Sequence, residues 1–219
     1  QRYVTVFFSD IRNFTSISET MSSSRLAKLL NLYLTAMSDI ILNNNGMVDK
    51  YIGDAIMAIW NAPHEDRNHA ANSVRSALAM KSALKKLTEE WKQSGFPSIS
   101  AGMGINTGDL NVGNFGSEQK FEYTVIGDEV NLASRLEGLN KIYGTDILVS
   151  ENTMKEAGDD FFFRYVDAVK VKGKERKIRI FETVCEGRPE HDILEEVAAF
   201  EAAVQKKKKK DFVEAGRII

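Results

Sequence analysis

The chain has 219 residues, of which 43% are hydrophobic and 27% are charged, a composition that suits one α/β domain with a short appendage. The formal net charge of −2 at pH 7 provides no basic field, so we expect no nucleic acid as a partner. Its apolar runs are far shorter than the roughly 20 residues that cross a bilayer. A single cysteine, Cys185, leaves no internal disulfide possible and indicates a reducing, cytoplasmic location.

Hydrophobic periodicity and turn signals predict an alternation of strands and helices. In chain order these are a strand at 3–9, a helical turn at 14–17, a helix at 22–43, strands at 47–52 and 55–60, a helix at 66–93, a strand at 98–105, a Gly- and Asn-rich stretch at 108–117, a strand at 121–125, a helix at 128–143, a strand at 147–150 and further strands within 161–184. The order predicts an α+β fold, a ferredoxin-like βαββαβ palm whose antiparallel sheet has helices on one face.

The C-terminal part of the chain differs in composition from the rest. Beyond Gly187 the sequence is rich in Glu, Ala and Lys, and residues 206–210 are all lysine. We therefore divide the chain into a domain over 1–187 and a helical, lysine-rich extension over 188–219. Because the chain begins at Gln1 and not at Met, we expect it to be part of a longer protein, with a regulatory or sensor domain upstream.

Two aspartates stand at the ends of predicted strands. Asp10 follows the first strand, and Asp54 lies in the Gly53-Asp54 turn that joins two strand-like runs as a hairpin. If the first strand lies beside the hairpin, both carboxylates reach the same end of the sheet. Mg²⁺ binds a few carboxylates and keeps sites open for phosphate oxygens, and two such ions can promote an in-line displacement. Considered alone, each aspartate is better explained as a structural residue, Asp10 as a helix cap and Asp54 as a turn residue. Together with the segments described below, the two favour metal binding.

Residues 11–13 lead from the first strand into the short helix. Free backbone N–H groups in this stretch and at Phe14 and Thr15, where the helix begins, can hold a triphosphate. The main-chain carbonyl of Ile11 can complete the shell of a metal ion. The connection therefore predicts phosphate binding next to the two aspartates.

Four segments in order resemble the class III nucleotide cyclases, which are the adenylyl and guanylyl cyclase catalytic domains. FFSDIRNFTS (7–16) and VDKYIGDAIMAIW (48–60) resemble the metal-binding segments. EYTVIGDEVNLASRLE (122–137) resembles the helix with the transition-state residues, and VKGK (171–174) resembles the phosphate-binding strand end. The resemblance covers about residues 3–184. It implies that ATP is converted to 3′,5′-cyclic AMP and pyrophosphate by attack of the ribose 3′-hydroxyl on the α-phosphate.

The resemblance also implies a role for each matching residue. The implied roles are binding of two Mg²⁺ or Mn²⁺ ions by Asp10, Ile11 and Asp54, purine recognition by Lys50 and Thr124, further substrate binding by Phe14, Thr15 and Lys172, ribose orientation by Asn131, and stabilisation of phosphate charge in the transition state by Arg135. Independently of the family, Asn131 and Arg135 are four residues apart on one predicted helix and so face the same direction.

The predicted purine is adenine. Lys50 can only donate a hydrogen bond, which suits adenine N1, and the Thr124 hydroxyl can accept one from the 6-amino group. Guanylyl cyclases of this family have an acid at the position of Lys50, whereas many adenylyl cyclases have Asp at the position of Thr124. Thr at that position is similar to the subgroup that includes bicarbonate-responsive soluble cyclases.

In the family, the metal ligands come from one subunit and the purine and transition-state residues from the other. This sequence contains both sets, so the resemblance implies a head-to-tail homodimer with two equivalent sites. The stretch 108–117 is expected to help form an arm at that interface, and a flexible loop explains its composition equally well. Alternatives remain open: a guanylyl cyclase, a diguanylate cyclase, whose signature is similar to residues 126–130, and a non-catalytic domain that binds nucleotide or dimerises.

Overall fold

The computed structural model describes residues 1–170, 177–191, 194–195, 197–200 and 202. Its strands are β1 (Arg2–Ile11), β2 (Met47–Ile52), β3 (Ala55–Trp60), β4 (Ala101–Gly116), β5 (Phe121–Ile126), β6 (Ile147–Ser150), β7 (Phe161–Lys170) and β8 (Lys177–Glu186). Its helices are α1 (Phe14–Glu19), α2 (Ser23–Asn43), α3 (His69–Gln93), α4 (Asp128–Tyr143) and α5 (Glu151–Ala157). Helix α5, which Ser150 caps by accepting a hydrogen bond from the Thr153 amide, was not predicted from the sequence.

The strands form one sheet in the order β2-β3-β1-β4-β6-β8-β7, and β5 pairs with β4 off this path. The order β2-β3-β1-β4 is that of a βαββαβ unit in which each helical crossover leaves room for one strand between the two it connects. Neighbouring strands pair antiparallel, except that β4 and β6 are parallel. The predicted α+β palm is therefore confirmed, with one parallel pair in its sheet.

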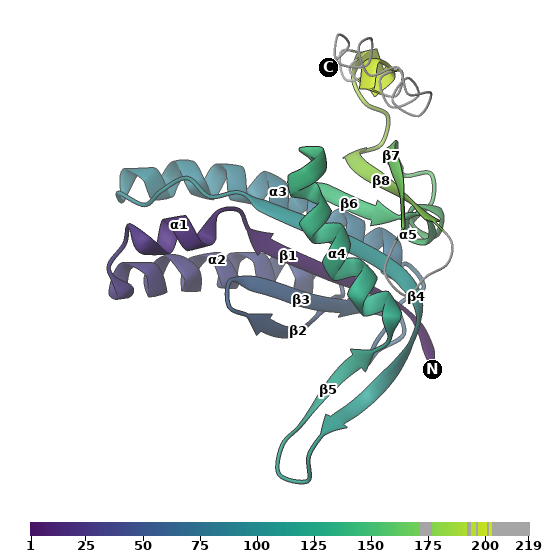
Figure 1. The fold of residues 1–219 in the computed structure, drawn as a ribbon, viewed down its shortest axis with the longest axis horizontal. Coiled ribbons are helices and arrows are strands. Elements are labelled where there is room, and N and C mark those ends of the chain that lie inside the picture. Colours follow the sequence, from purple (N-terminus) through teal and green to yellow (C-terminus); the bar gives the residue numbers. More distant parts are fainter. Residues whose placement is uncertain (171–176, 192–193, 196, 201, 203–219) are drawn as a thin grey trace.

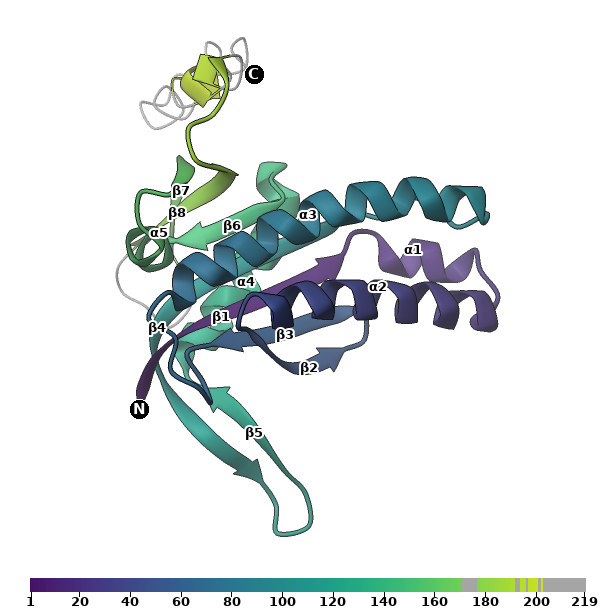
Figure 2. The same cartoon turned by 180° about the vertical axis from the view of Figure 1, so that it is seen from behind.

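Helices cover both faces of the sheet, whereas the sequence predicted helices on one face. Helices α2 and α3 lie behind the sheet in Figure 1 and in front of it in Figure 2, and α4 lies on the opposite side. Phe7 of β1 packs into the core beneath α2 and α3, while Val4 and Val6 pack into a second core with Ala133 of α4. Because β1 is apolar on both faces, each face needs a covering layer.

Gly104 of β4 allows α4 to lie directly on the sheet. A Cβ atom at Gly104 would lie 2.2 Å from the Glu137 amide nitrogen and 2.3 Å from the Ala133 carbonyl oxygen. Such distances to backbone atoms leave no room for a side chain. Gly104 therefore sets the position of α4, and with it the position of Glu137.

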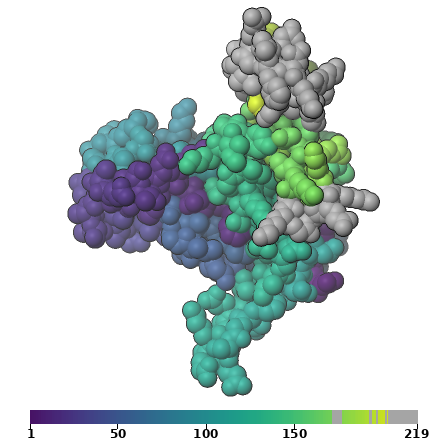
Figure 3. Space-filling view, viewed as in Figure 1, coloured from purple at the N-terminus to yellow at the C-terminus, as the bar shows by residue number. Residues whose placement is uncertain are grey.

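The stretch 108–117 is not a separate loop, because nearly all of it belongs to the long strand β4. The first half of β4 pairs with β1, and the second half pairs with β5 from Asn111 to Gly116. This second half leaves the main sheet, and together with β5 it forms an arm that projects from the body of the molecule (Figures 1 and 3). Phe121, near the tip of the arm, is 66% exposed. An arm in this region was predicted from the sequence.

Parts of the sequence-based prediction fall outside the described residues. These parts are the VKGK segment with Lys172 and most of the extension over 188–219. Among the described residues, the helices lack the length and apolar character that crossing a membrane requires.

Replacement of Gly104 by Ala should destabilise the fold, because its Cβ would collide with backbone atoms of α4. Overpacking of a core usually costs about 1–3 kcal/mol, and a collision with backbone is expected to reach at least that range. The measurement is the free energy of unfolding in urea. Gly113→Ala is the matched control, because it lies on the same strand with no atom within 4 Å of the added carbon. Equal stability of the two variants would contradict this account of how α4 is positioned.

Candidate functional site

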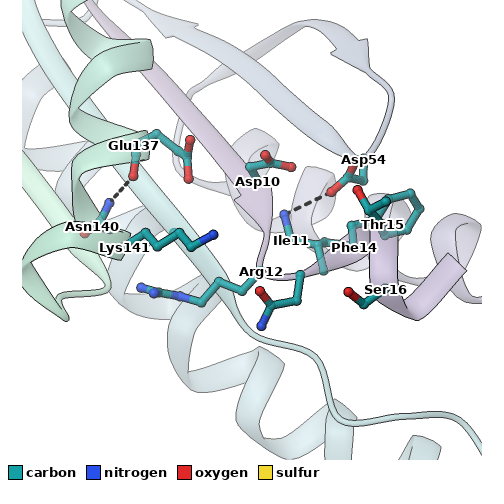
Figure 4. Close-up of a pocket in the computed structure, with 13 residues that line it drawn as sticks. Asp10, Ile11, Arg12, Phe14, Thr15, Ser16, Asp54, Glu137, Asn140 and Lys141 are labelled. Atoms are coloured by element: carbon teal, nitrogen blue, oxygen red, sulfur yellow. Dashed lines mark hydrogen bonds between the residues drawn. The ribbon is translucent and has the colours of Figure 1, made fainter. Parts of the chain in front are cut away.

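Strand register brings Asp10 and Asp54 together. Ser9 of β1 lies opposite Ile56 of β3, so Asp10 continues along β1 toward the hairpin turn that contains Asp54. That turn is tight, since Ile52 pairs with Ala55, and Gly53 supplies the positive φ of 67° that a two-residue hairpin loop requires. Asp54 Oδ2 accepts a hydrogen bond of 3.2 Å from the Ile11 amide (Figure 4).

These two aspartates line a pocket of about 560 Å³. The full lining comprises Asp10, Ile11, Arg12, Asn13, Phe14, Thr15, Ser16, Asp54, Gly102, Glu137, Gly138, Asn140 and Lys141. All the residues predicted to bind metal are therefore in one place, together with Phe14 and Thr15. In Figure 4, Glu137 and Lys141 extend from α4 toward the side of the pocket where Asp10 lies.

The pocket concentrates negative charge away from water. Burial, the hydrogen bond with Asp54 and the charges of Asp54 and Glu137 together raise the pKa of Asp10 to about 7. Burial likewise raises the pKa of Glu137 to about 7, against the opposing charge of Arg12. Crowded carboxylates of this kind become fully ionised when a cation joins them. The donor set of two aspartates and the Ile11 carbonyl is therefore suited to hard divalent ions.

The backbone between β1 and α1 is less available for phosphate than the sequence suggested. The Ile11 amide donates to Asp54, and the Arg12 amide donates to the Ser100 carbonyl oxygen at 2.8 Å. Asn13 adopts a left-handed conformation with φ of 56° as the helix begins. Amides in the first turn of a helix, here those of Phe14 and Thr15, have no acceptor within the helix. The free donors are thus those of α1 itself.

A second polar cluster joins the arm to the edge strand β2. Lys50 forms an ion pair with Glu122, with Nζ 2.8 Å from Oε2, and lies 3.9 Å from Asp49 Oδ2. The hydroxyl of Thr124 donates a hydrogen bond of 2.6 Å to the same Asp49 oxygen. The structure therefore brings the two predicted purine-binding residues together around Asp49. Neither Lys50 nor Thr124 is among the described residues that line the pocket of Asp10.

The predicted transition-state residues lie on the exposed surface of α4. Asn131 and Arg135 are both exposed, one turn apart, whereas Leu132 and Leu136 are buried against the sheet. They are likewise not among the described residues that line the pocket of Asp10, although α4 also contributes Glu137 to it. The predicted site residues that the structure describes thus lie in three groups within one chain: the carboxylate pocket, the cluster around Asp49 and the surface of α4.

Asp49 and Glu137 are site residues that the sequence analysis missed. Asp49 directly precedes Lys50, and Glu137 follows Arg135 by two residues, so both lie inside segments that resemble the family motifs. In a regular strand Asp49 would point away from Lys50, and in a helix Glu137 points away from Arg135. The strand irregularity at Asp49 overturns the first expectation, whereas Glu137 does point away from Arg135 and lines the pocket of Asp10.

Comparisons with known proteins identify the family of this chain. A family model of the Adenylate and Guanylate cyclase catalytic domain matches residues 1–183. Adenylate cyclase 1 of Rhizobium meliloti is 38% identical over 181 residues, which are 83% of this chain and 27% of that protein. The adenylate cyclase of Anabaena cylindrica is 40% identical over 188 residues, which are 83% of this chain and 36% of that protein. The chain thus spans about a quarter to a third of the length of these relatives.

Solved structures show the same likeness. The crystal structure of the adenylyl cyclase CyaB from P. aeruginosa is 39% identical, with a TM-score of 0.79 over 86% of this chain and 97% of that one. The guanylyl cyclase Cya2 is 33% identical, with a TM-score of 0.77 over 87% of this chain and 95% of that one. The chain belongs to the class III adenylyl and guanylyl cyclase catalytic domain family.

Proposed function

We propose that this chain is the catalytic domain of an adenylyl cyclase, which converts ATP to 3′,5′-cyclic AMP and pyrophosphate by in-line attack of the ribose 3′-hydroxyl on the α-phosphate. The observation that carries the proposal is the convergence of Asp10 and Asp54 at one half-buried pocket. Relatives that are 38% and 40% identical are named adenylate cyclases, which supports ATP as the substrate. A role in signal transduction follows from the product.

Asp10, Asp54 and the Ile11 carbonyl would hold two Mg²⁺ or Mn²⁺ ions. Bound there, such ions supply neutralisation of phosphate charge and acidify the 3′-hydroxyl. Two aspartates and one carbonyl do not fill the octahedral shell of Mg²⁺, which leaves coordination positions for the oxygens of the triphosphate.

The remaining residues bind and orient the substrate. The first-turn amides of Phe14 and Thr15 donate to phosphate oxygens, and Lys172 adds a positive charge to the terminal phosphates. Asn131 orients the ribose. The planar guanidinium of Arg135 stabilises charge on the transferring phosphate, because its donors match phosphate oxygens. Lys50 and Thr124 bind the purine.

The site is shared between two copies of the chain in a head-to-tail homodimer. Support comes from the separation within one chain: the carboxylate pocket is on one part of the surface, while Asn131 and Arg135 are exposed on α4. A second copy can bring its α4 to the pocket and receive the same contact in return, which produces two equivalent sites. The β4–β5 arm is placed to take part in this interface. The cytoplasmic location and an upstream regulatory domain remain predictions.

Guanylyl cyclase activity is the second candidate. The guanylyl cyclase Cya2 is 33% identical to this chain over nearly its whole length, and a threonine hydroxyl is a weaker acceptor for an amino group than a carboxylate would be. Diguanylate cyclase activity and a non-catalytic role are the remaining alternatives. The identity of the product separates all four.

Mass spectrometry of the product should show cyclic AMP from ATP, in larger yield than cyclic GMP from GTP at equal concentration. Both yields should require Mg²⁺ or Mn²⁺, and excess EDTA should abolish them because Asp10 and Asp54 then have no ion to bind. Predominant cyclic GMP or a cyclic dinucleotide would replace the proposal with one of the alternatives. Absence of any product with either nucleotide would make the domain non-catalytic.

Two inactive variants should complement each other when mixed. Asp54→Ala and Arg135→Ala should each lose activity, the latter by about 10²-fold or more. Random pairing of equal amounts makes half of the dimers hybrid, each with one intact site of two, so about a quarter of the wild-type activity should return. Asp10→Ala mixed with Asp54→Ala is the control, because both sites of that hybrid remain damaged. Failure of the first mixture to recover activity would refute the shared site.

The threonine at position 124 also predicts a regulator. Resemblance to the bicarbonate-responsive subgroup implies that bicarbonate raises the rate of cyclic AMP formation. The measurement is a titration with bicarbonate at fixed pH and fixed chloride, so that neither the acidity nor the chloride concentration changes. A flat response would place the chain outside that subgroup and would leave the cyclase proposal intact.

A further inference from the structure

Strand β2 contains an irregularity at Asp49. Val48 pairs with Ala58 of β3 and Lys50 pairs with the adjacent residue Met57, so Asp49 is an extra residue in the ladder. In a regular strand, Asp49 and Lys50 would point to opposite faces. A bulge changes the direction of side chains at the inserted residue. It allows two consecutive residues of β2 to approach the same neighbour.

That neighbour is one face of β5. Glu122 and Thr124 are two residues apart on β5 and therefore share a face. Glu122 binds Lys50 at 2.8 Å, and the Thr124 hydroxyl donates to Asp49 Oδ2 at 2.6 Å. The bulge is thus the feature that lets both purine-binding residues meet the same carboxylate.

Asp49 is an unusual residue in this position because its side chain is 0% exposed. Its Oδ1 has no hydrogen-bond partner among the described residues. Burial raises the pKa of the Asp49 carboxyl, whereas the hydrogen bond from Thr124 and the ammonium of Lys50, 3.9 Å from Oδ2, oppose that rise and favour the ionised form. An ionised carboxylate can only accept hydrogen bonds. The Thr124 hydroxyl therefore donates its proton to Asp49, and the lone pairs of Thr124 Oγ1 can accept a hydrogen bond from another donor.

We propose that Asp49 is a positioning residue that fixes Thr124 as a hydrogen-bond acceptor and thereby selects 6-amino purines over 6-oxo purines. The inference rests on the proposed function, because it assigns a specificity role within the same substrate site. Adenine matches the pair, since its 6-amino group donates to Thr124 Oγ1 and its N1 accepts from Lys50. Without Asp49, the hydroxyl could equally donate or accept.

A 6-oxo purine meets two mismatches at this pair. Its O6 is an acceptor and would face the lone pairs of Thr124, and its N1–H is a donor and would face the ammonium of Lys50. Rotation of the Thr124 hydroxyl toward O6 would remove the hydrogen bond from a buried carboxylate whose other oxygen already has no partner among the described residues. Loss of such a bond to a buried charged group is costly, so the rotation is opposed.

The test compares ATP with inosine triphosphate, which has the 6-oxo group and N1–H but lacks the 2-amino group of GTP. The measured quantity is the ratio of kcat/KM for the two nucleotides. In Asp49→Asn, the amide can donate to Thr124 and release its hydroxyl proton, so the ratio should fall by at least about tenfold. Asp39→Asn is the matched control, because it makes the same change at an exposed carboxylate of α2 and should leave the ratio unchanged.

A double-mutant cycle shows whether Asp49 acts through Thr124. In a Thr124→Val background the hydroxyl is absent, so Asp49→Asn should change the ratio by less than about twofold. Thr124→Ser keeps a hydroxyl that can donate to Asp49 and should retain the selectivity of the wild type. Asp49→Ala, checked by thermal unfolding beside Asp49→Asn, provides a second variant with the same expected loss.

An unchanged ratio in folded Asp49 variants, with both nucleotides slowed equally, would reduce Asp49 to a structural residue and overturn the inference. An equal fall of the ratio in the Thr124→Val background would also overturn it, since Asp49 would then act by another route. Equal kcat/KM of the wild type for ATP and inosine triphosphate would also overturn the inference about Asp49, but it would leave the cyclase proposal intact. Absence of any cyclic product from the wild type would instead refute the proposed function.

Discussion

The register between β1 and β3 forces Asp10 and Asp54 into one half-buried pocket, and this enforced proximity is the constraint on which the site depends. Two carboxylates so placed repel each other, and burial adds to the cost, as the pKa of Asp10 near 7 shows. The sheet holds them there because Val4, Val6 and Phe7 of β1 are packed on both faces. A divalent cation would relieve the repulsion, which supports the proposed binding of metal ions at this pocket.

Helix α4 extends this constraint to the rest of the site. Its buried residues Leu132, Ala133 and Leu136 lie on β4 at a distance that only glycine at position 104 permits. The same contact directs Glu137 into the carboxylate pocket. The opposite side of the helix then necessarily carries Asn131 and Arg135 outward. Helix α4 thus contributes Glu137 to the carboxylate pocket of its own chain and exposes Asn131 and Arg135 at the surface. The proposed head-to-tail dimer requires this arrangement, because the exposed residues of one copy would meet the pocket of the other.

The sequence was sufficient for the parts of the fold that depend on local pattern. Strand and helix periodicity located the palm, and the Gly53-Asp54 turn indicated that Asp54 meets Asp10. Periodicity could not show that α4 covers the second face, because that depends on Gly104 of β4 leaving space for it. It could not show that the stretch 108–117 is strand, because β1 and β5 supply the hydrogen bonds that override low strand propensity. The bulge at Asp49 is a property of pairing between strands and has no local signal.

Asp49 illustrates why a buried charge in this fold is better explained by specificity than by stability. Removing a carboxylate from water costs free energy that one hydrogen bond and one ammonium at 3.9 Å offset only in part. An apolar side chain at this position would be easier to bury. The Asp49 carboxylate instead fixes the direction of one hydrogen bond. Because the Thr124 hydroxyl donates to it, that hydroxyl cannot donate to the purine, as an isolated threonine could. A hydroxyl that could otherwise donate or accept thereby gains the acceptor character that a carboxylate at position 124 would have by itself.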